Sequence, residues 1–150
     1  MARYRTEQPF DGPPEVAFDY LAHFTSVAEW DPGVTGATRV DDGPLGVGSR
    51  FRVVVKAGPG STALVYEVRE FEPGRRIRLV AESSSLRSDD VITVTPTGAG
   101  ATVVYEADLT LRGVATVLTP ALGLVFDRIG DRAAAGLRRA LDDVAAGAVS

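Results

Sequence analysis

The middle of the chain alternates apolar and polar side chains, which is the pattern of half-buried β-strands. The stretch "GSRFRVVVKAG" places Phe51, Val53 and Val55 on one face and Arg or Lys on the other. Turn residues at 58–60 and 73–74 separate this stretch from the next ones. Because turns this short join antiparallel neighbours, the pattern predicts an antiparallel sheet with one buried and one solvated face. The predicted strands cover residues 3–10, 48–58, 62–71, 75–82, 89–96 and 101–113.

Two short helices are predicted between the first strand and the rest of the sheet, over residues 13–22 and 24–30. Proline at the start of the first segment suits a first helical turn, where its missing N–H is not needed. The Asp-Pro-Gly run at 31–33 ends the second segment, because proline disfavours helix in the residue before it.

The C-terminal segment changes to a helical period. Apolar residues recur there every three or four positions, and charged residues take the opposite face, so a long amphipathic helix is predicted over residues 119–146. Its apolar positions are Leu118, Leu122, Phe126, Ile129, Ala133, Leu137, Leu141 and Val144.

The order of elements defines an α+β architecture. A sheet with one apolar face needs a cover, and the final helix is the one predicted element long enough to supply it. A strongly twisted sheet of about seven strands wraps around such a helix. This order resembles the helix-grip fold of the START/Bet v 1-like (SRPBCC) superfamily. The stretches "VAFDYLAHFTSVAEWDPGV", "GPLGVGSRFRV", "YEVREFEPGRRIRL" and "AAAGLRRALD" are similar to its bacterial polyketide cyclase/dehydrase and lipid-transport branch.

The resemblance spans nearly the whole chain, so residues 1–150 are expected to form a single helix-grip domain. It implies an apolar cavity between the sheet and the C-terminal helix. The small residues Gly130, Ala133 and Gly136 either leave volume there or allow close packing of the helix, and the resemblance favours volume. The expected lining comprises Trp30, Phe51, Val53, Tyr66, Val68, Leu79, Ile92, Tyr105, Leu109, Phe126, Ile129 and Ala133.

Composition and charge narrow the classes of function. The chain has 150 residues, a net charge of −4, one His and no Cys, so thiol chemistry is excluded. The sequence has no stripe of basic residues, so a nucleic acid is not expected as a partner. A lone His with scattered carboxylates lacks the spacing of metal ligands, so no metal and no cofactor are expected. No secretory signal and no apolar run of membrane-spanning length occur, which favours a cytoplasmic protein without a membrane span.

The segment at residues 23–31 holds the single His and the single Trp. His23 is a candidate general base, but no catalytic partner is evident, which favours a role at the end of the first helix. Trp30 is interpreted as a brace that pins the short helices to the sheet, with stacking on a ligand as the alternative. Asp31 is interpreted as a turn residue.

Three further residues are candidates for moving protons. Tyr66 and Tyr105 lie on the apolar faces of their strands, so each phenol needs a partner: a backbone carbonyl in a solid core, or water or a ligand in a cavity. Asp90 shares a face with Ile92 and Val94, and an inward-facing carboxylate there would have a raised pKa. Because buried Asp is rare, a solvated hairpin position beside Asp89 is the favoured interpretation.

Three functions remain open. The first is binding of a small apolar or aromatic molecule, lipid-like or polyketide-like, with the protein as monomer or homodimer. The second is a polyketide aromatase/cyclase or dehydratase that uses the same cavity. The third is a protein-interaction module. A polar cluster deep in the cavity would favour catalysis, and a uniformly apolar lining would favour carriage.

Overall fold

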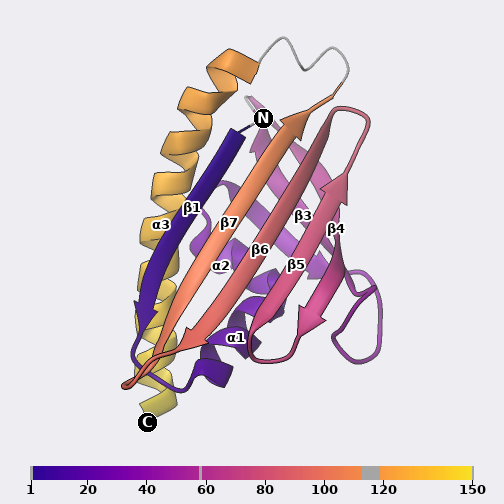
Figure 1. Ribbon diagram of the computed structural model, residues 1–150. Coiled ribbons are helices and arrows are strands. Elements are labelled where there is room, and N and C mark those ends of the chain that lie inside the picture. Colours follow the sequence, from indigo (N-terminus) through magenta and orange to yellow (C-terminus); the bar gives the residue numbers. More distant parts are fainter. Residues whose placement is uncertain (1, 58, 113–118, 150) are drawn as a thin grey trace.

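A computed structural model describes residues 2–57, 59–112 and 119–149 (Figure 1). Its strands are β1 (Ala2–Phe10), β2 (Val34–Arg39), β3 (Arg50–Ala57), β4 (Gly60–Glu72), β5 (Arg76–Glu82), β6 (Leu86–Pro96) and β7 (Ala101–Leu111). Its helices are α1 (Pro14–Ala22), the short 3-10 helix η1 (Phe24–Ser26), α2 (Val27–Trp30) and α3 (Thr119–Val149).

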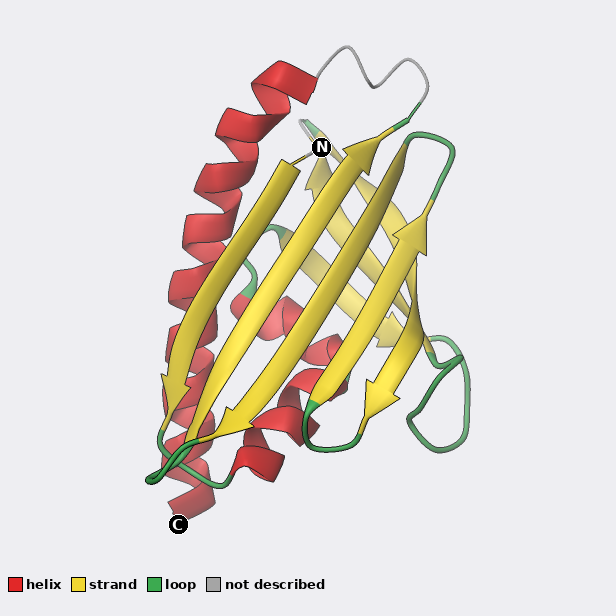
Figure 2. Ribbon diagram, in the orientation of Figure 1, coloured by secondary structure: helices red, strands yellow, loops and turns green. Residues whose placement is uncertain are grey.

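The strands form one antiparallel sheet in the order β1-β7-β6-β5-β4-β3-β2. The sheet curls, so that β3 lies behind the long strands β5 to β7, and α3 runs beside β1 (Figure 2). The helices α1 and α2 lie on the same inner side, where α1 packs against β6 and α2 packs against α3. This arrangement is the predicted helix-grip fold.

Two features of the sheet differ from the prediction. The strand β2 was not predicted, because "VTGATR" shows little alternation, and its pairing with β3 is irregular between Val34 and Gly36. The strand β6 begins at Leu86 rather than at residue 89. Its first residues are polar and look like a loop, but Ser88 faces the core and finds polar partners there.

The small residues of α3 allow close packing. A methyl group at Gly130 would overlap the ring of Tyr4 on β1, and one at Gly136 would overlap the carbonyl oxygen of Trp30. The interpretation that these glycines leave volume is therefore wrong. Both glycines let α3 approach its neighbours closely, as glycine does wherever two backbones come together.

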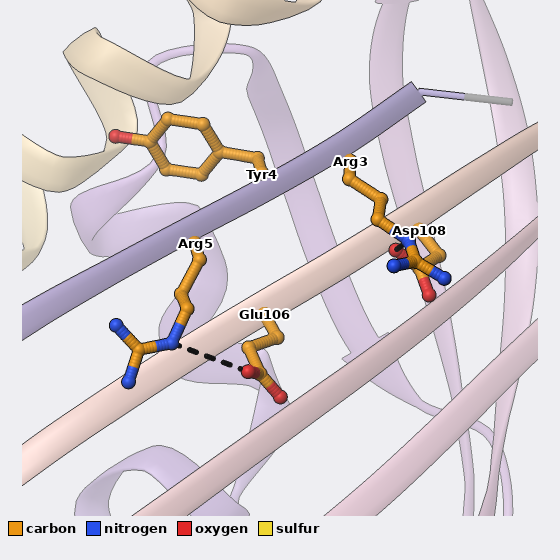
Figure 3. A pocket seen from close by; sticks show the side chains of 5 residues that line it. All are labelled: Arg3, Tyr4, Arg5, Glu106 and Asp108. Carbon is orange, nitrogen blue, oxygen red and sulfur yellow. Dashed lines mark ion pairs between the residues drawn. The ribbon is translucent and has the colours of Figure 1, made fainter.

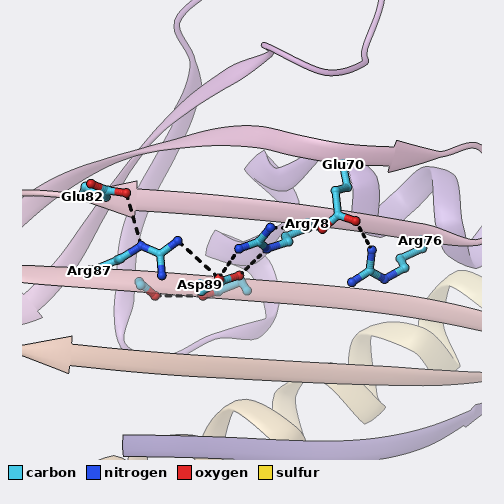
Figure 4. Close-up of polar contacts among 8 residues, drawn as sticks. Glu70, Arg76, Arg78, Glu82, Arg87 and Asp89 are labelled. Carbon is cyan, nitrogen blue, oxygen red and sulfur yellow. Dashed lines mark hydrogen bonds and ion pairs between the residues drawn. The ribbon is translucent and has the colours of Figure 1, made fainter. Parts of the chain in front are cut away.

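The outer face of the sheet carries paired charges (Figure 4). Arg78 donates to both carboxylate oxygens of Asp89, at 3.0 and 2.7 Å, and to Glu70 at 3.2 Å. Because these side chains are partly exposed, solvent weakens each pair and its contribution to stability is small. The sequence pattern predicts five arginines on this face, and four of them lie there exposed or half-buried: Arg50, Arg52, Arg76 and Arg78. The fifth, Arg39, is paired with Phe51 across β2 and β3 and therefore projects from the inner side, so its assignment is wrong.

Candidate functional site

A cluster of four polar side chains lies on the inner, otherwise apolar face of the sheet. Tyr66 comes from β4, Ser88 and Asp90 come from β6, and Tyr105 comes from β7. All four are buried, and Asp90 is only 3% exposed. The expectation that Asp90 is a solvated hairpin residue is therefore wrong. The alternation along β6 correctly placed the Asp90 side chain on the inner face. Although buried Asp is rare, hydrogen-bond partners make the burial of this one tolerable.

The hydrogen bonds of this cluster all point toward Asp90. The Tyr66 hydroxyl donates to Ser88 Oγ at 3.0 Å, and Ser88 Oγ donates to Asp90 Oδ1 at 2.8 Å. The Tyr105 hydroxyl donates to Asp90 Oδ2. The phenols thus find side-chain partners, rather than the backbone carbonyls of a solid core. Because Asp90 accepts at both oxygens, the arrangement suits its ionised form.

The strand register explains why these four residues meet. Tyr66, Ala81 and Ser88 are paired in one row across β4, β5 and β6. Since Ala81 is small, the Tyr66 side chain reaches over it to Ser88. Asp90 pairs with Ala107 and Tyr105 pairs with Ile92, which makes Tyr105 and Asp90 diagonal neighbours. Diagonal pairs lie within reach of aromatic side chains.

The burial of this cluster shifts its ionisation. Burial raises the pKa of Asp90 from its ordinary 3.8 to about 6, against the opposing effect of the hydrogen bonds from Tyr105 and Ser88. Burial also raises the pKa of Tyr66 and of Tyr105, and the negative charge of Asp90 adds to both effects. Asp90 therefore changes charge close to neutral pH, while the phenols remain protonated.

The short helices close over this cluster. Trp30 is 2% exposed, and its ring meets the ring of Tyr105 edge-on with centroids 5.3 Å apart. This position fits the role of a brace. Trp30 Nε1 and Ser26 Oγ are buried without a hydrogen-bond partner. Buried polar atoms normally have a partner, so these two atoms are available to water or a ligand.

Of the other candidates in this segment, His23 lies away from the cluster, whereas Asp31 forms a turn and its charge acts on the cluster. His23 is exposed at the end of α1, where its Nδ1 lies 2.8 Å from the carbonyl oxygen of Asp19. None of its described hydrogen bonds reaches the buried cluster. Asp31 accepts a hydrogen bond from the backbone N–H of Gly33 at 2.8 Å, which is the predicted turn role. Burial raises the pKa of Asp31, and its charge acts on Asp90.

Most of the expected lining residues lie together on the inner side of the fold. Phe51, Val53, Val68, Leu79, Ile92 and Ala133 are buried beside the cluster residues, and Leu109 is half-buried. The side chains of Phe126 and Ile129 lie outside the described residues. Sequence reasoning missed Ser88 and Ser26. Ser88 was detectable, because it lies two positions before Asp90 and must share its face.

The inner face becomes more exposed toward one end of the sheet. On β7, Val103 is fully buried, Tyr105 is 9% exposed, and Leu109 and Leu111 are only half-buried. Leu86, which pairs with Leu111, is half-buried as well. The polar cluster therefore lies between a closed end of the core and an end where apolar side chains are accessible.

Two hollows lie outside this region. One of about 430 Å³ lies at the edge strand β1 and its neighbour β7 and is lined by Arg3, Tyr4, Arg5, Glu106 and Asp108 (Figure 3). There Arg3 pairs with Asp108 and Arg5 with Glu106, while the Tyr4 ring points toward α3. The other, of about 240 Å³, lies between the short helices and α3. Its lining comprises Tyr20, Glu29, Gly136, Arg139, Ala140, Asp143 and Val144.

Among the described residues, no helix is long and apolar enough to cross a membrane. The same residues contain no group of three or more His, Cys, Asp or Glu side chains placed to hold a metal ion.

A curled antiparallel sheet that grips a long C-terminal helix defines the helix-grip fold. The chain belongs to the family described as polyketide cyclase/dehydrase and lipid transport, whose family model matches residues 1–148. No curated protein matches the sequence.

Several solved structures are similar to this chain. A protein from Thermus thermophilus has a TM-score of 0.76 at 18% identity, with 99% of each chain covered. The ZhuI aromatase/cyclase from a Streptomyces species has a TM-score of 0.76 at 12% identity, with 93% of each chain covered. A START superfamily protein from Mycobacterium smegmatis has a TM-score of 0.72 at 14% identity, covering 95% of this chain and 97% of its own. At such identities the likeness shows the fold alone.

Proposed function

We propose that this protein binds a small apolar or aromatic molecule between the sheet and α3, with one polar group of the ligand at the Asp90 cluster. The observation that carries the proposal is the buried network of Tyr66, Ser88, Asp90 and Tyr105 on an apolar face. Few, well-placed polar groups within an apolar lining are typical of small-molecule sites.

Two further observations support this function. Trp30, whose ring packs on Tyr105, and Ser26 each hold a buried polar atom with no hydrogen-bond partner among the described residues, so a ligand oxygen or nitrogen has groups to bond. The half-buried Leu86, Leu109 and Leu111 offer an apolar approach to the cluster from one end of the sheet. The family description, polyketide cyclase/dehydrase and lipid transport, agrees with an apolar ligand.

The variant Ala133→Phe tests this function. Ala133 is buried on α3, one helical turn from Gly136, whose neighbour Trp30 packs on Tyr105. A phenyl group at this position is expected to compete with the ligand and to weaken binding of the neutral dye N-phenyl-naphthylamine at least about tenfold. The measurement is a dye titration on both proteins, with thermal melting as the check on folding.

The matched control is Ala140→Phe, two turns further along α3 at a half-buried position. It is expected to keep the affinity of the unchanged protein. The proposed function is contradicted if the dye does not bind the unchanged protein saturably, or if Ala133→Phe binds it equally well. A large loss of melting temperature in Ala133→Phe would also contradict it, because overpacking a solid core costs about 1–3 kcal/mol.

A second candidate is a cyclase or dehydratase that acts in the same place. The observation that favours it is the pKa of Asp90, which at about 6 suits a general acid or base near neutral pH. The hydrogen-bonded row from Tyr66 through Ser88 to Asp90 offers a path along which a proton reaches the carboxylate. In this function Asp90 would exchange the proton, and Tyr66 or Tyr105 would contact a ligand oxygen.

A further inference from the structure

We propose that the preferred ligand is a hydrophobic organic cation, a protonated amine attached to an aromatic or aliphatic body, with its ammonium group beside Asp90. This inference rests on the proposed function and names its ligand class. It is carried by two observations together. Aromatic rings surround the cluster, and none of the described cationic side chains is buried near it.

The rings come from both sides of the interior. Trp30 on α2 packs against Tyr105 on β7, with centroids 5.3 Å apart. Phe24 on η1 packs against Tyr66 on β4 at 5.1 Å and against Phe51 on β3 at 6.2 Å. Two of these rings carry a hydroxyl group, Tyr66 and Tyr105, and both hydroxyls belong to the hydrogen-bonded cluster around Asp90. Aromatic faces attract cations, and rings combined with a carboxylate form a common recognition site for ammonium groups.

The charges around Asp90 leave its negative charge without a positive counterpart. Every Arg, Lys and His side chain that the structure describes is exposed or half-buried. On α3, the described side chains that are buried belong to Ala133, Leu137, Leu141 and Ala145, and none of them carries a charge. Tyr105, Asp31 and Asp89 act on Asp90, and Tyr66 belongs to the same hydrogen-bonded cluster; all four are acidic groups. A buried charge normally has a partner, and a cationic ligand would supply it.

This charge pattern separates three ligand classes. A carboxylate or phosphate ligand would meet a second negative charge within the apolar interior. A neutral alcohol would bond the cluster but leave the ionised Asp90 without a counter-charge. A protonated amine would donate hydrogen bonds to Asp90 and neutralise it, so binding of the amine strengthens as Asp90 ionises.

The experiment compares three probes with one aromatic body: naphthylmethylamine, naphthalenemethanol and naphthoate. Calorimetric titrations at pH 7.5 are expected to give an affinity for the amine at least about tenfold higher than for the alcohol, with naphthoate the weakest. As the pH falls from 7.5 to 5, the affinity for the amine should drop toward that of the alcohol, whose own affinity changes little. Because this pH profile is measured on the unchanged protein, the test does not depend on the folding of a variant.

Two variants sharpen the comparison. Asp90→Asn is expected to lose about tenfold in affinity for the amine while the alcohol changes less than about threefold. Asp89→Asn is the matched control, because its carboxylate lies on the outer face and pairs with Arg78. Although its charge acts on Asp90 from a distance, this variant should keep the preference for the amine over the alcohol and over naphthoate.

The outcomes distinguish this inference from the function on which it rests. If the alcohol binds as tightly as the amine, or if Asp90→Asn keeps the preference for the amine, the amine inference is wrong and the proposed binding function stands. If none of the three probes binds, the binding function fails and the amine inference fails with it.

Discussion

Replacing Gly136 by Ala is expected to lower the free energy of unfolding by up to about 2 kcal/mol. The added methyl group would overlap the carbonyl oxygen of Trp30, a backbone atom that moves only if α2 or α3 moves. Overpacking of this kind costs about 1–3 kcal/mol. The gain in helix propensity from Gly to Ala, about 1 kcal/mol, offsets only part of that cost. Urea unfolding monitored by circular dichroism measures the difference.

The matched control is Gly147→Ala near the end of the same helix. A methyl group at Gly147 meets no atom within 4 Å, so this variant is expected to keep or slightly raise stability. The close approach of α3 to α2 would be refuted if Gly136→Ala were as stable as Gly147→Ala. The Gly136→Ala variant should also change the fluorescence of Trp30, the single Trp of the chain, because its helix is displaced.

Replacing Asp90 by Asn is expected to remove a pH-dependent cost of folding. The folded protein holds the Asp90 proton up to a pKa of about 6, whereas the ordinary value is 3.8. The folded state therefore binds more protons between these values, and stability falls as the pH rises through this range. The gap between the two values corresponds to about 3 kcal/mol, lost in full above pH 6. Asn stays neutral at every pH and does not incur this loss.

The measurement is the free energy of unfolding of both proteins from pH 4 to pH 7.5. The Asn variant should gain up to about 3 kcal/mol relative to the unchanged protein across this range. Asp41, Glu70 and Asp89 have lowered pKa values and act in the opposite direction, but both proteins share them, so they cancel in the difference. Two parallel stability curves would show that Asp90 is not the buried titrating group.

The fold was largely predictable because its strands alternate cleanly and its last segment changes to a helical period. The same alternation placed Tyr66, Asp90 and Tyr105 on the inner face. It could not show that they meet. Their contact depends on the register that aligns Tyr66, Ala81 and Ser88 and makes Tyr105 diagonal to Asp90. Register between strands depends on the geometry of the connecting turns and on the buried pattern of the whole sheet, which the alternation within one strand does not show.

Two misjudgements have identifiable physical causes. The prediction that Asp90 is solvated rested on how rarely Asp is buried in proteins on average. Hydrogen bonds from Ser88 and Tyr105 make the burial of this Asp tolerable. The volume expected beside Gly130 and Gly136 rested on side-chain size alone. Small residues on a helix permit either a void or a close approach, and only the positions of Tyr4 and Trp30 decide between them.

The central claim, that a small apolar molecule binds inside the grip at the Asp90 cluster, is tested most directly by nuclear Overhauser effects between a bound naphthalene probe and the protein. The account predicts contacts from the probe to the ring protons of Trp30, Tyr66 and Tyr105. Contacts confined to residues of the outer hollow, such as Arg3 and Arg5, or no contacts from a saturably bound probe to the three inner rings, would contradict it.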